Sequence, residues 1–327
     1  MKVCIYGAGA IGGHIGGHLV RGGADVSVIA RGPHLEAMQK NGLRVYGDSL
    51  DFSVPVNATE NPADLGPQDY VFITLKSHQV DGVLEKMQPL LGPETAVIPP
   101  TTGIPWWYFY GLEGPNKNRR LERLDPGGRQ WDLIGPQRAL GCAFWTAAEV
   151  TEPGVIHQDG LRASYPIGEP DDSESPRLVK LVEAMTAGGL HAPLQKDIRG
   201  QIWTKMINSL CWNQAAFLTE AINGEFQTAP DVVEVVRRMM VEMEAVAEAL
   251  GAVIPVPMEK RITMTVNATD HTMSMLQDLQ RGRPIEIDVL ADSVAAMSQA
   301  AGVPTPTVDA LIALTKLKGK IRGVYGG

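Results

Sequence analysis

The chain opens with an apolar run that breaks directly into closely spaced glycines. Residues 2–12 read KVCIYGAGAIG, so Gly7, Gly9 and Gly12 follow a G-x-G-x-x-G spacing, and a helix-like stretch, residues 10–20, comes next. In this context the first glycine allows a tight turn, the second lets a phosphate group approach the backbone, and the third lets helix and strand pack closely. The pattern predicts a dinucleotide bound on the free amides of the helix. The alternative is a glycine-rich turn without a ligand.

Short β-branched runs and helix-like stretches alternate over the first hundred residues. Strands are expected at residues 25–29, 70–75 and 95–98, and helices at residues 34–41 and 79–88. Such alternation is typical of a parallel sheet with crossover helices. We therefore predict an α/β fold with an N-terminal Rossmann-type doubly wound sheet.

Residues 106–138 differ in texture from their surroundings. They begin with the aromatic cluster WWYFY at residues 106–110 and contain the turn sequence DPGG at residues 125–128, between strand-compatible runs. We interpret the segment as an insertion that carries a hairpin. The aromatic cluster is interpreted as hydrophobic packing, with a pocket wall as the alternative.

Strand-like runs return from residue 139 to residue 167, where Gly154 and Gly160 are expected at turns, and a closing helix is expected at residues 174–187.

Because 327 residues are many for one compact core, two domains are expected. The first, residues 1–196, is the dinucleotide-binding Rossmann-type domain.

Long helical patterns fill the second domain, residues 197–327. Met239, Met240 and Met243 lie on one of these patterns and are interpreted as filler of the core or of a subunit interface, which makes a homodimer plausible. The expected helices cover residues 200–218, 231–250, 258–279, 287–301 and 307–318.

Composition excludes several classes of protein. The net charge of −8, from 37 acidic and 29 basic residues, argues against nucleic-acid binding. Cys4, Cys142 and Cys211 lie far apart, which predicts neither a disulfide framework nor a zinc site and fits a reducing cytoplasm. His14 and His18 have the spacing of metal ligands, but no third ligand is apparent, so no metal is expected. No apolar run reaches the length of a membrane span.

Arg31 stands about twenty residues after the glycines, where an NAD-preferring fold carries an acidic residue for the ribose hydroxyls. Asp25 lies at the start of the same strand and is poorly placed for that role. An arginine at the end of the strand suits a 2′-phosphate, so NADPH is favoured as the cofactor. The alternative is an ordinary surface cation.

A polar stripe crosses the otherwise apolar helix expected at residues 200–218. Lys205, Ser209 and Asn213 recur every four residues and therefore share one face. Burying the stripe without partners would be costly, so it lines a polar cavity or enters a tertiary hydrogen-bond network, and spacing alone leaves both open. A lysine in apolar surroundings is suited to donating a proton near neutral pH.

Glu286 opens the fourth of the expected helices. Residues 274–278, SMLQD, are expected to end the preceding helix, before the turn at residues 281–284. On the sequence alone, Glu286 is interpreted as a first-turn carboxylate favoured by the helix dipole.

These motifs together resemble the ketopantoate reductase (2-dehydropantoate 2-reductase) family nearly from end to end, apart from residues 106–138. The resemblance implies a substrate cleft between a Rossmann domain and a helical domain, where NADPH reduces a 2-oxo acid. Its substrate would be ketopantoate, reduced to pantoate in pantothenate biosynthesis. The resemblance rests on GAGAIG at residues 7–12, Arg31, TLK at residues 74–76 with Gln79, Trp203-x-Lys205 with Asn213, NGE at residues 223–225, and SMLQD at residues 274–278 followed by Glu286.

The resemblance also implies roles for individual residues. Lys205 matches the catalytic proton donor, and Glu286 matches a carboxylate that meets the cofactor and belongs to the catalytic pair. The substrate-binding positions are matched by Ser209, Asn213, Asn223 and Ser274. The cofactor-binding positions are matched by Gly7, Ala8, Gly9, Ala10, Ile11, Gly12, Arg31, Lys76, Thr102, Ala148 and Glu286.

Two positions depart from the family pattern. Thr102, in Thr101-Thr102-Gly103-Ile104-Pro105, stands where the family shows asparagine, and Ser209 replaces another asparagine. Both are shorter and lack the paired donor and acceptor of an amide. A different 2-oxo or 2-hydroxy acid is therefore an alternative substrate. A non-catalytic NADP-binding sensor is a third reading, against which the retention of Lys205 and Glu286 counts.

Overall fold

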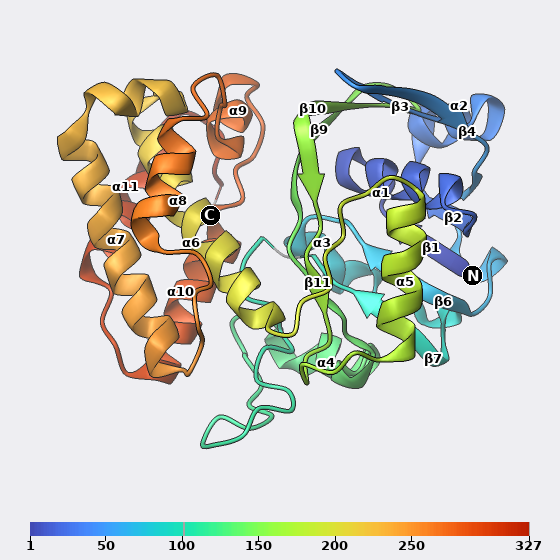
Figure 1. Cartoon of the computed structure of the whole chain (residues 1–327), viewed down its shortest axis with the longest axis horizontal. Coiled ribbons are helices and arrows are strands. Elements are labelled where there is room, and N and C mark those ends of the chain that lie inside the picture. The colour runs from blue at the N-terminus through green and yellow to red at the C-terminus, as the bar shows by residue number, and fades with distance from the viewer. Residues whose placement is uncertain (101, 327) are drawn as a thin grey trace. The chain divides into compact units, whose positions relative to one another are not determined.

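The computed structural model describes residues 1–100 and 102–326, without the side chains of residues 161 and 162. It forms two compact units (Figure 1). The first contains residues 1–100 and 105–198, and the second contains residues 102–104 and 199–326. Thr101 lies outside the described residues.

A five-stranded parallel sheet forms the centre of the first unit, as predicted. Its central strands β1, β2 and β6 are buried nearly throughout, as expected for a sheet covered on both faces. The strand β1 lies at the centre, between β2 and β6. The strand order therefore reverses at β1, because one part of the chain adds strands on one side of β1 and the later part adds them on the other. The carboxyl end of β1 is thus the topological switch point, where sheets of this kind bind ligands. The strand order is β5-β2-β1-β6-β7, with β1 at Lys2–Tyr6, β2 at Asp25–Ile29, β5 at Asn57–Thr59, β6 at Gln68–Ile73 and β7 at Leu91–Ile98.

A second sheet of four strands belongs to the same unit. Its β3–β4 hairpin was not predicted, although the polar turn at residues 47–49 between two alternating runs was a signal for it. Gly154 lies in the turn before β10 as expected, but Gly160 lies inside β10, where its φ of +77° accompanies a shift of register. The turn prediction for Gly160 is therefore wrong. The order is β4-β3-β10-β9, with β3 at Leu43–Gly47, β4 at Leu50–Val54, β9 at Trp145–Glu152 and β10 at Val155–Ser164.

The first helix, α1 (Ala10–Arg21), lies between these two sheets (Figure 1). A Cβ atom on Gly13 would stand 2.8 Å from Ile156 of β10, and one on Gly17 would stand 2.7 Å from Val45 of β3. These glycines therefore let the second sheet approach the helix more closely than any side chain would allow.

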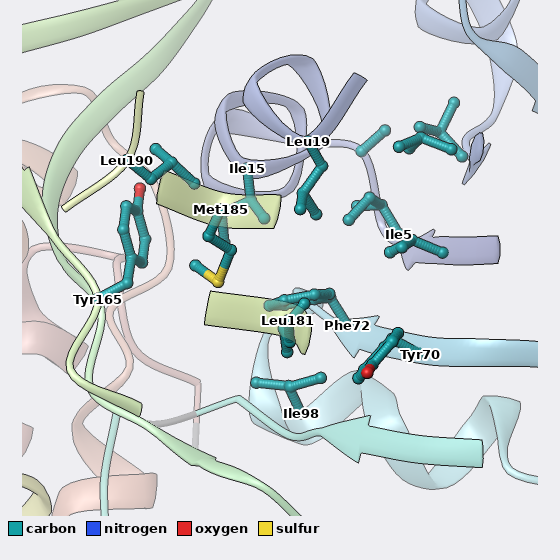
Figure 2. Close-up of a cluster of buried hydrophobic side chains, with 14 of the residues drawn as sticks. Ile5, Ile15, Leu19, Tyr70, Phe72, Ile98, Tyr165, Leu181, Met185 and Leu190 are labelled. Carbon is teal, nitrogen blue, oxygen red and sulfur yellow. The ribbon is translucent and has the colours of Figure 1, made fainter. Parts of the chain in front are cut away.

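The core of the first unit joins α1 and α5 (Pro176–Ala187) to the parallel sheet (Figure 2). Ser175 is the N-cap residue of α5, and its side chain accepts a hydrogen bond from the Leu178 amide. Burial of each large apolar side chain here contributes roughly 1.5–3 kcal/mol. The cluster includes Ile5, Ile15, Leu19, Tyr70, Phe72, Ile98, Leu181 and Met185.

The helix expected at residues 34–41 is α2 (Gly32–Asn41), but the one expected at residues 79–88 is much shorter. Only α3 (Ser77–Val80) is α-helical, followed by 3₁₀ turns. Gly82 lowers helix stability, and Pro89 disfavours helical geometry in the residue before it. These two residues account for the error.

The segment 106–138 contains no hairpin in the described structure, so that prediction is wrong. Residues 126–128 form a 3₁₀ turn that leads into α4 (Arg129–Leu133). The Asp125 carboxylate accepts hydrogen bonds from the amides of Gln130 and Trp131, at 2.7 and 2.9 Å, and thereby starts a helix instead of a strand. The aromatic residues 106–109 are at most 4% exposed, which agrees with the packing interpretation.

Six helices of the second unit are described. One prediction is wrong here, because residues 258–279 form two helices instead of one. The carbonyls of Thr269 and His271 accept hydrogen bonds from the backbone of Gly224 and Asn223, so this stretch pairs with another segment instead of continuing the helix. The helices are α6 (Ile198–Thr219), α7 (Pro230–Ala249), α8 (Met258–Val266), α9 (Ser274–Gln280), α10 (Ile287–Ala301) and α11 (Pro306–Ile321).

Several polar and sulfur-containing side chains singled out in the sequence are buried. The three cysteines are buried free thiols, and Met239, Met240 and Met243 are core residues. His14 bonds to Gln158 and Tyr165 through its two ring nitrogens. Among the described residues there is no group of three side chains suited to hold a metal, and no helix is long and apolar enough to cross a membrane.

Candidate functional site

The glycine turn after β1 has the geometry of a cradle for a phosphate group. Gly7 has a φ of +107°, and a Cβ on Gly12 would stand only 2.3 Å from the Gly7 carbonyl oxygen. The Thr74 hydroxyl donates to the same carbonyl at 2.6 Å. Apart from Gly9 itself and its two chain neighbours, no described residue has an atom within 4 Å of a Cβ built on Gly9, so the backbone there is open to a ligand. The structure therefore has the tight turn at Gly7 and the close packing at Gly12 that the spacing predicted, and it leaves Gly9 open.

The N-terminus of α1 carries backbone donors for an anion. Its N-cap, Gly9, makes no side-chain capping bond, and the first turn contains no acidic residue. The Gly13 amide bonds to the Gly9 carbonyl at 2.7 Å, so the amides of Ala10, Ile11 and Gly12 precede the helical hydrogen-bond ladder. Together with the helix dipole, these amides favour a bound phosphate.

His34 supports this turn and was missed by the sequence analysis. The Gly154 amide donates to its Nδ1 at 2.9 Å, so the proton of the neutral ring is on Nε2, which donates to the Ala8 carbonyl at 2.6 Å. His34 thus joins the glycine turn to the β9–β10 turn. The partners lie 26 and 120 residues away in the sequence, so no local pattern could reveal them.

Arg31 lies at the same edge of the parallel sheet as the glycine turn. Tyr6 pairs with Ile29 at the ends of β1 and β2, so Gly7 and Ala30 leave neighbouring strands together. Arg31 follows as the exposed N-cap residue of α2. The structure therefore brings the exposed Arg31 to the strand end beside the glycine turn.

Lys76 and Ala148 lie in different parts of the first unit. Lys76 is exposed after β6, also at a carboxyl end of the parallel sheet, and its amide donates to the Gln79 side chain at 3.3 Å. Ala148 is half-buried on β9, opposite Gln158 of β10. Because Gln158 bonds to His14 of α1, the strand pair that carries Ala148 is tied to the helix of the glycine turn.

The polar stripe on α6 ends in a tertiary hydrogen-bond network. Lys205 and Ser209 are half-buried, whereas Asn213 is buried. The Asn213 side-chain amide donates to the Ser209 carbonyl at 2.8 Å, and its oxygen accepts from the Met275 amide at 2.9 Å and the Ser274 hydroxyl at 3.2 Å. The spacing left open whether the stripe lines a polar cavity or enters a hydrogen-bond network, and Asn213 enters a network.

Ser274 begins α9 and does not end the preceding helix, which corrects the sequence-based placement. Met273 is the N-cap residue and makes no side-chain capping bond. The side chain of Asn213, from another helix, takes over that function by accepting from the Met275 amide. The exposed Ser274 hydroxyl is held at the same oxygen.

Asn223 has a buried acceptor suited to a ligand. The residue is 2% exposed, and its backbone amide donates to the His271 carbonyl at 3.1 Å. Its Oδ1 has no hydrogen-bond partner among the described residues. Since an unmade hydrogen bond of a buried group costs about 1–3 kcal/mol, a hydroxyl or ammonium donor at this oxygen would be stabilised.

Glu286 and Thr102 both belong to the unit that contains α10. Glu286 is the half-buried N-cap residue of this helix and makes no side-chain capping bond to it. The helix dipole favours a carboxylate here, as the sequence analysis expected. Thr102 is half-buried and belongs, with residues 103 and 104, to the unit that contains α10.

Comparisons with known proteins agree with this geometry. The family description "Ketopantoate reductase PanE/ApbA" matches residues 3–104, and its C-terminal counterpart matches residues 197–319. A 2-dehydropantoate 2-reductase from Mesorhizobium japonicum is 42% identical over 99% of this chain and 100% of its own length. The chain belongs to the ketopantoate reductase family.

Further known proteins are similar to this chain in sequence or in fold. A 2-dehydropantoate 2-reductase from Pyrococcus horikoshii is 28% identical and covers 99% of each chain. The crystal structure of a candidate ketopantoate reductase from Ralstonia solanacearum has a TM-score of 0.90 and 35% identity over 99% of each chain. A D-mandelate dehydrogenase, at 20% identity and a TM-score of 0.81, shares the fold.

The residues matched to the family's functional positions divide between the two units. Residues 7–12, Arg31, Lys76 and Ala148 belong to the first unit. The second unit contains the remaining seven positions, of which hydrogen bonds described above join Ser209, Asn213 and Ser274. These seven are Thr102, Lys205, Ser209, Asn213, Asn223, Ser274 and Glu286.

Proposed function

We propose that this protein uses NADPH to reduce ketopantoate to pantoate, a reaction of pantothenate biosynthesis. The observation that carries the proposal is the 42% identity, over the full chain, to a protein named 2-dehydropantoate 2-reductase. The open glycine turn at the sheet's switch point supports a nicotinamide dinucleotide as cofactor. The three buried free cysteines fit a reducing compartment, and we propose the cytoplasm.

The choice of NADPH over NADH rests on Arg31. Its exposed guanidinium lies at the end of β2, where an acidic residue would otherwise bind the ribose hydroxyls of NAD. Arginine instead pairs with a 2′-phosphate through charge-assisted hydrogen bonds. The amides at the start of α1 would hold the pyrophosphate, and Lys76, Ala148, Thr102 and Glu286 would line the rest of the cofactor.

When bound, the nicotinamide cofactor would supply the hydride for the ketone carbon of the 2-oxo acid. As negative charge develops on the ketone oxygen, the Lys205 ammonium stabilises it and transfers one proton from Nζ to that oxygen, which forms the hydroxyl of the product. Lys205 then regains its proton from solvent. Glu286 would orient the reacting groups by accepting a hydrogen bond.

The side chains of Asn213, Asn223, Ser274 and Ser209 would bind the carboxylate and hydroxyl groups of the substrate. The unpaired Oδ1 of Asn223 is suited to accept from a substrate hydroxyl. The Ser274 hydroxyl, held by Asn213, can turn towards a carboxylate. Such contacts hold the ketone in one orientation for hydride transfer.

A second candidate keeps the reaction and changes the substrate. Thr102 and Ser209 replace asparagines of the family pattern, and each removes an amide from the proposed site. The remaining hydroxyls leave more room and offer fewer hydrogen bonds, which suits a 2-oxo acid with a different side chain.

The deciding experiment follows the loss of NADPH absorbance with ketopantoate and with a panel of other 2-oxo acids. We expect the highest kcat/KM with ketopantoate. A higher value with another acid would support the second candidate. Tight NADPH binding without turnover of any acid would instead support a non-catalytic sensor and overturn the proposed reaction.

A further inference from the structure

The tripeptide 102–104 belongs to a different unit from the residues that flank it in the sequence. It follows the parallel-sheet strand β7 and precedes Pro105, yet it is part of the second unit. Within that unit it packs against α10, the helix that Glu286 begins. Thr102, which departs from the family pattern, is the first residue of this tripeptide.

The hydroxyl of Ser293 holds the tripeptide on α10 with two hydrogen bonds in series. The Ile104 amide donates to Ser293 Oγ at 2.9 Å, and Oγ donates in turn to the Val289 carbonyl at 2.7 Å. Ser293 is fully buried. Its single hydroxyl proton is therefore directed along the helix, which leaves a lone pair of the oxygen facing the Ile104 amide.

Gly103 allows this close approach. A Cβ on Gly103 would stand 2.3 Å from Ser293 Oγ and 3.0 Å from the Val289 carbonyl oxygen. Any side chain at residue 103 would therefore displace the tripeptide from the helix. The glycine and the serine form one contact, in which the glycine provides the space and the serine provides the hydrogen bond.

We infer that Ser293 is a positioning residue for the 2-oxo acid site. It does not touch the reacting atoms. Its hydroxyl anchors the backbone of Gly103 and Ile104 to α10 and thereby sets the place of the Thr102 side chain relative to Glu286, about two helical turns before Ser293. This inference rests on the proposed function, which makes Thr102 and Glu286 parts of that site.

The first test compares Ser293→Ala with Ser298→Ala. Ser298 lies on the same helix, and its hydroxyl donates to Ala295 within that helix, so it is a matched control. With Ser293→Ala we expect kcat/KM for ketopantoate to fall about tenfold or more, because small displacements of positioning groups are costly. The Kd of NADPH should change less than kcat/KM, since the glycine turn and Arg31, which belong to the other unit, keep their contacts with the cofactor even when Thr102 shifts. Ser298→Ala should leave both quantities within about twofold of the wild-type values.

A second readout does not depend on activity. Amide hydrogen exchange of Ile104 should accelerate in Ser293→Ala and not in Ser298→Ala, because its acceptor is removed only in the first variant. Gly103→Ala should lower kcat/KM at least as much as Ser293→Ala while keeping the hydroxyl. The double variant, Gly103→Ala with Ser293→Ala, lacks the Ser293 Oγ that a Cβ on residue 103 would meet at 2.3 Å. Its melting temperature should therefore exceed that of Gly103→Ala alone.

The outcomes separate this inference from the proposed function. If the wild-type protein reduces ketopantoate but Ser293→Ala matches Ser298→Ala in kcat/KM, the positioning role is overturned and the proposed function stands. Unchanged exchange at Ile104 would likewise overturn the anchoring contact. If the wild-type protein turns over no 2-oxo acid, the proposed function fails, and accelerated exchange at Ile104 would still support the contact itself.

Discussion

The side-chain oxygen of Asn213 lies 3.2 Å from the Ser274 hydroxyl, although 61 residues separate them in the sequence. The same oxygen caps α9 through the Met275 amide. One buried amide on α6 therefore determines both where α9 begins and where a proposed substrate-binding hydroxyl is held. Its effect on binding can be separated from its effect on stability.

The substitution Asn213→Ala should lower the free energy of unfolding by roughly 1–3 kcal/mol, because it removes three hydrogen bonds and leaves buried partners unpaired. It should also raise the KM for ketopantoate. Ser274→Ala, which removes one bond at an exposed hydroxyl, should raise KM with a much smaller loss of stability. Urea denaturation and steady-state kinetics measure the two effects, and equal stabilities of both variants would contradict the capping role.

The substitution Arg31→Ala should raise the Kd of NADPH about 10- to 100-fold and change that of NADH little. The reason is that a charge-assisted hydrogen bond contributes about 1.5–3 kcal/mol and only NADPH carries the 2′-phosphate. Lys40→Ala removes another exposed cation from the same helix and is the control. Fluorescence titration measures both affinities. Equal losses for NADPH and NADH would remove the assignment of Arg31.

The substitution His34→Ala should weaken NADPH and NADH binding alike, by about tenfold. His34 holds the Ala8 carbonyl of the glycine turn, so its loss frees the loop that binds the pyrophosphate common to both cofactors. His78→Ala, at an exposed position on α3, is the control. A loss confined to NADPH would show that His34 acts on the 2′-phosphate instead of the turn.

The substitution Lys205→Ala should lower kcat by about a hundredfold to ten-thousandfold, as loss of a general acid usually does. Circular dichroism and the NADPH titration should match those of the wild-type protein. Lys260→Ala, an exposed lysine on α8, is the control and should keep full turnover. A Lys205 variant that retains most of its kcat would rule out the proton-donor role.

The stability of the protein should fall as the pH is lowered from about 7 to 5, partly because of His14. Burial beside His18 lowers the pKa of His14 from 6.5 to about 4. Below pH 6.5 the unfolded chain therefore binds a proton that the folded protein does not bind, and by pH 5 the loss from this residue approaches about 2 kcal/mol. Urea denaturation at both pH values measures it.

The control for this pH dependence is His14→Gln, which can keep hydrogen bonds to Gln158 and Tyr165 but does not titrate. The variant should lose less stability than the wild-type protein between pH 7 and pH 5. An identical loss in both proteins would exclude His14 as a source of the pH dependence.

Local patterns predicted those parts of the fold that local physics controls. The glycine spacing predicted the turn after β1, and hydrophobic periodicity predicted β2, α2, α7 and α10 to within a few residues. Two predictions failed where a specific hydrogen bond, which no sequence period encodes, decides the conformation. The Asp125 carboxylate starts a helix where a hairpin was expected, and the backbone of residues 223–224 takes the carbonyls that would have continued α8.

The same division holds for the candidate site. The types of residue in the candidate site could be predicted from the sequence. They are a glycine turn, Arg31 at the end of the next strand, and a lysine on the polar stripe of an apolar helix. The contacts of these residues could not be predicted, because hydrogen bonds between segments distant in the sequence leave no periodic pattern in it. Only the tertiary structure shows that His34 holds the glycine turn, that Asn213 caps α9, and that Ser293 anchors the tripeptide beginning at Thr102.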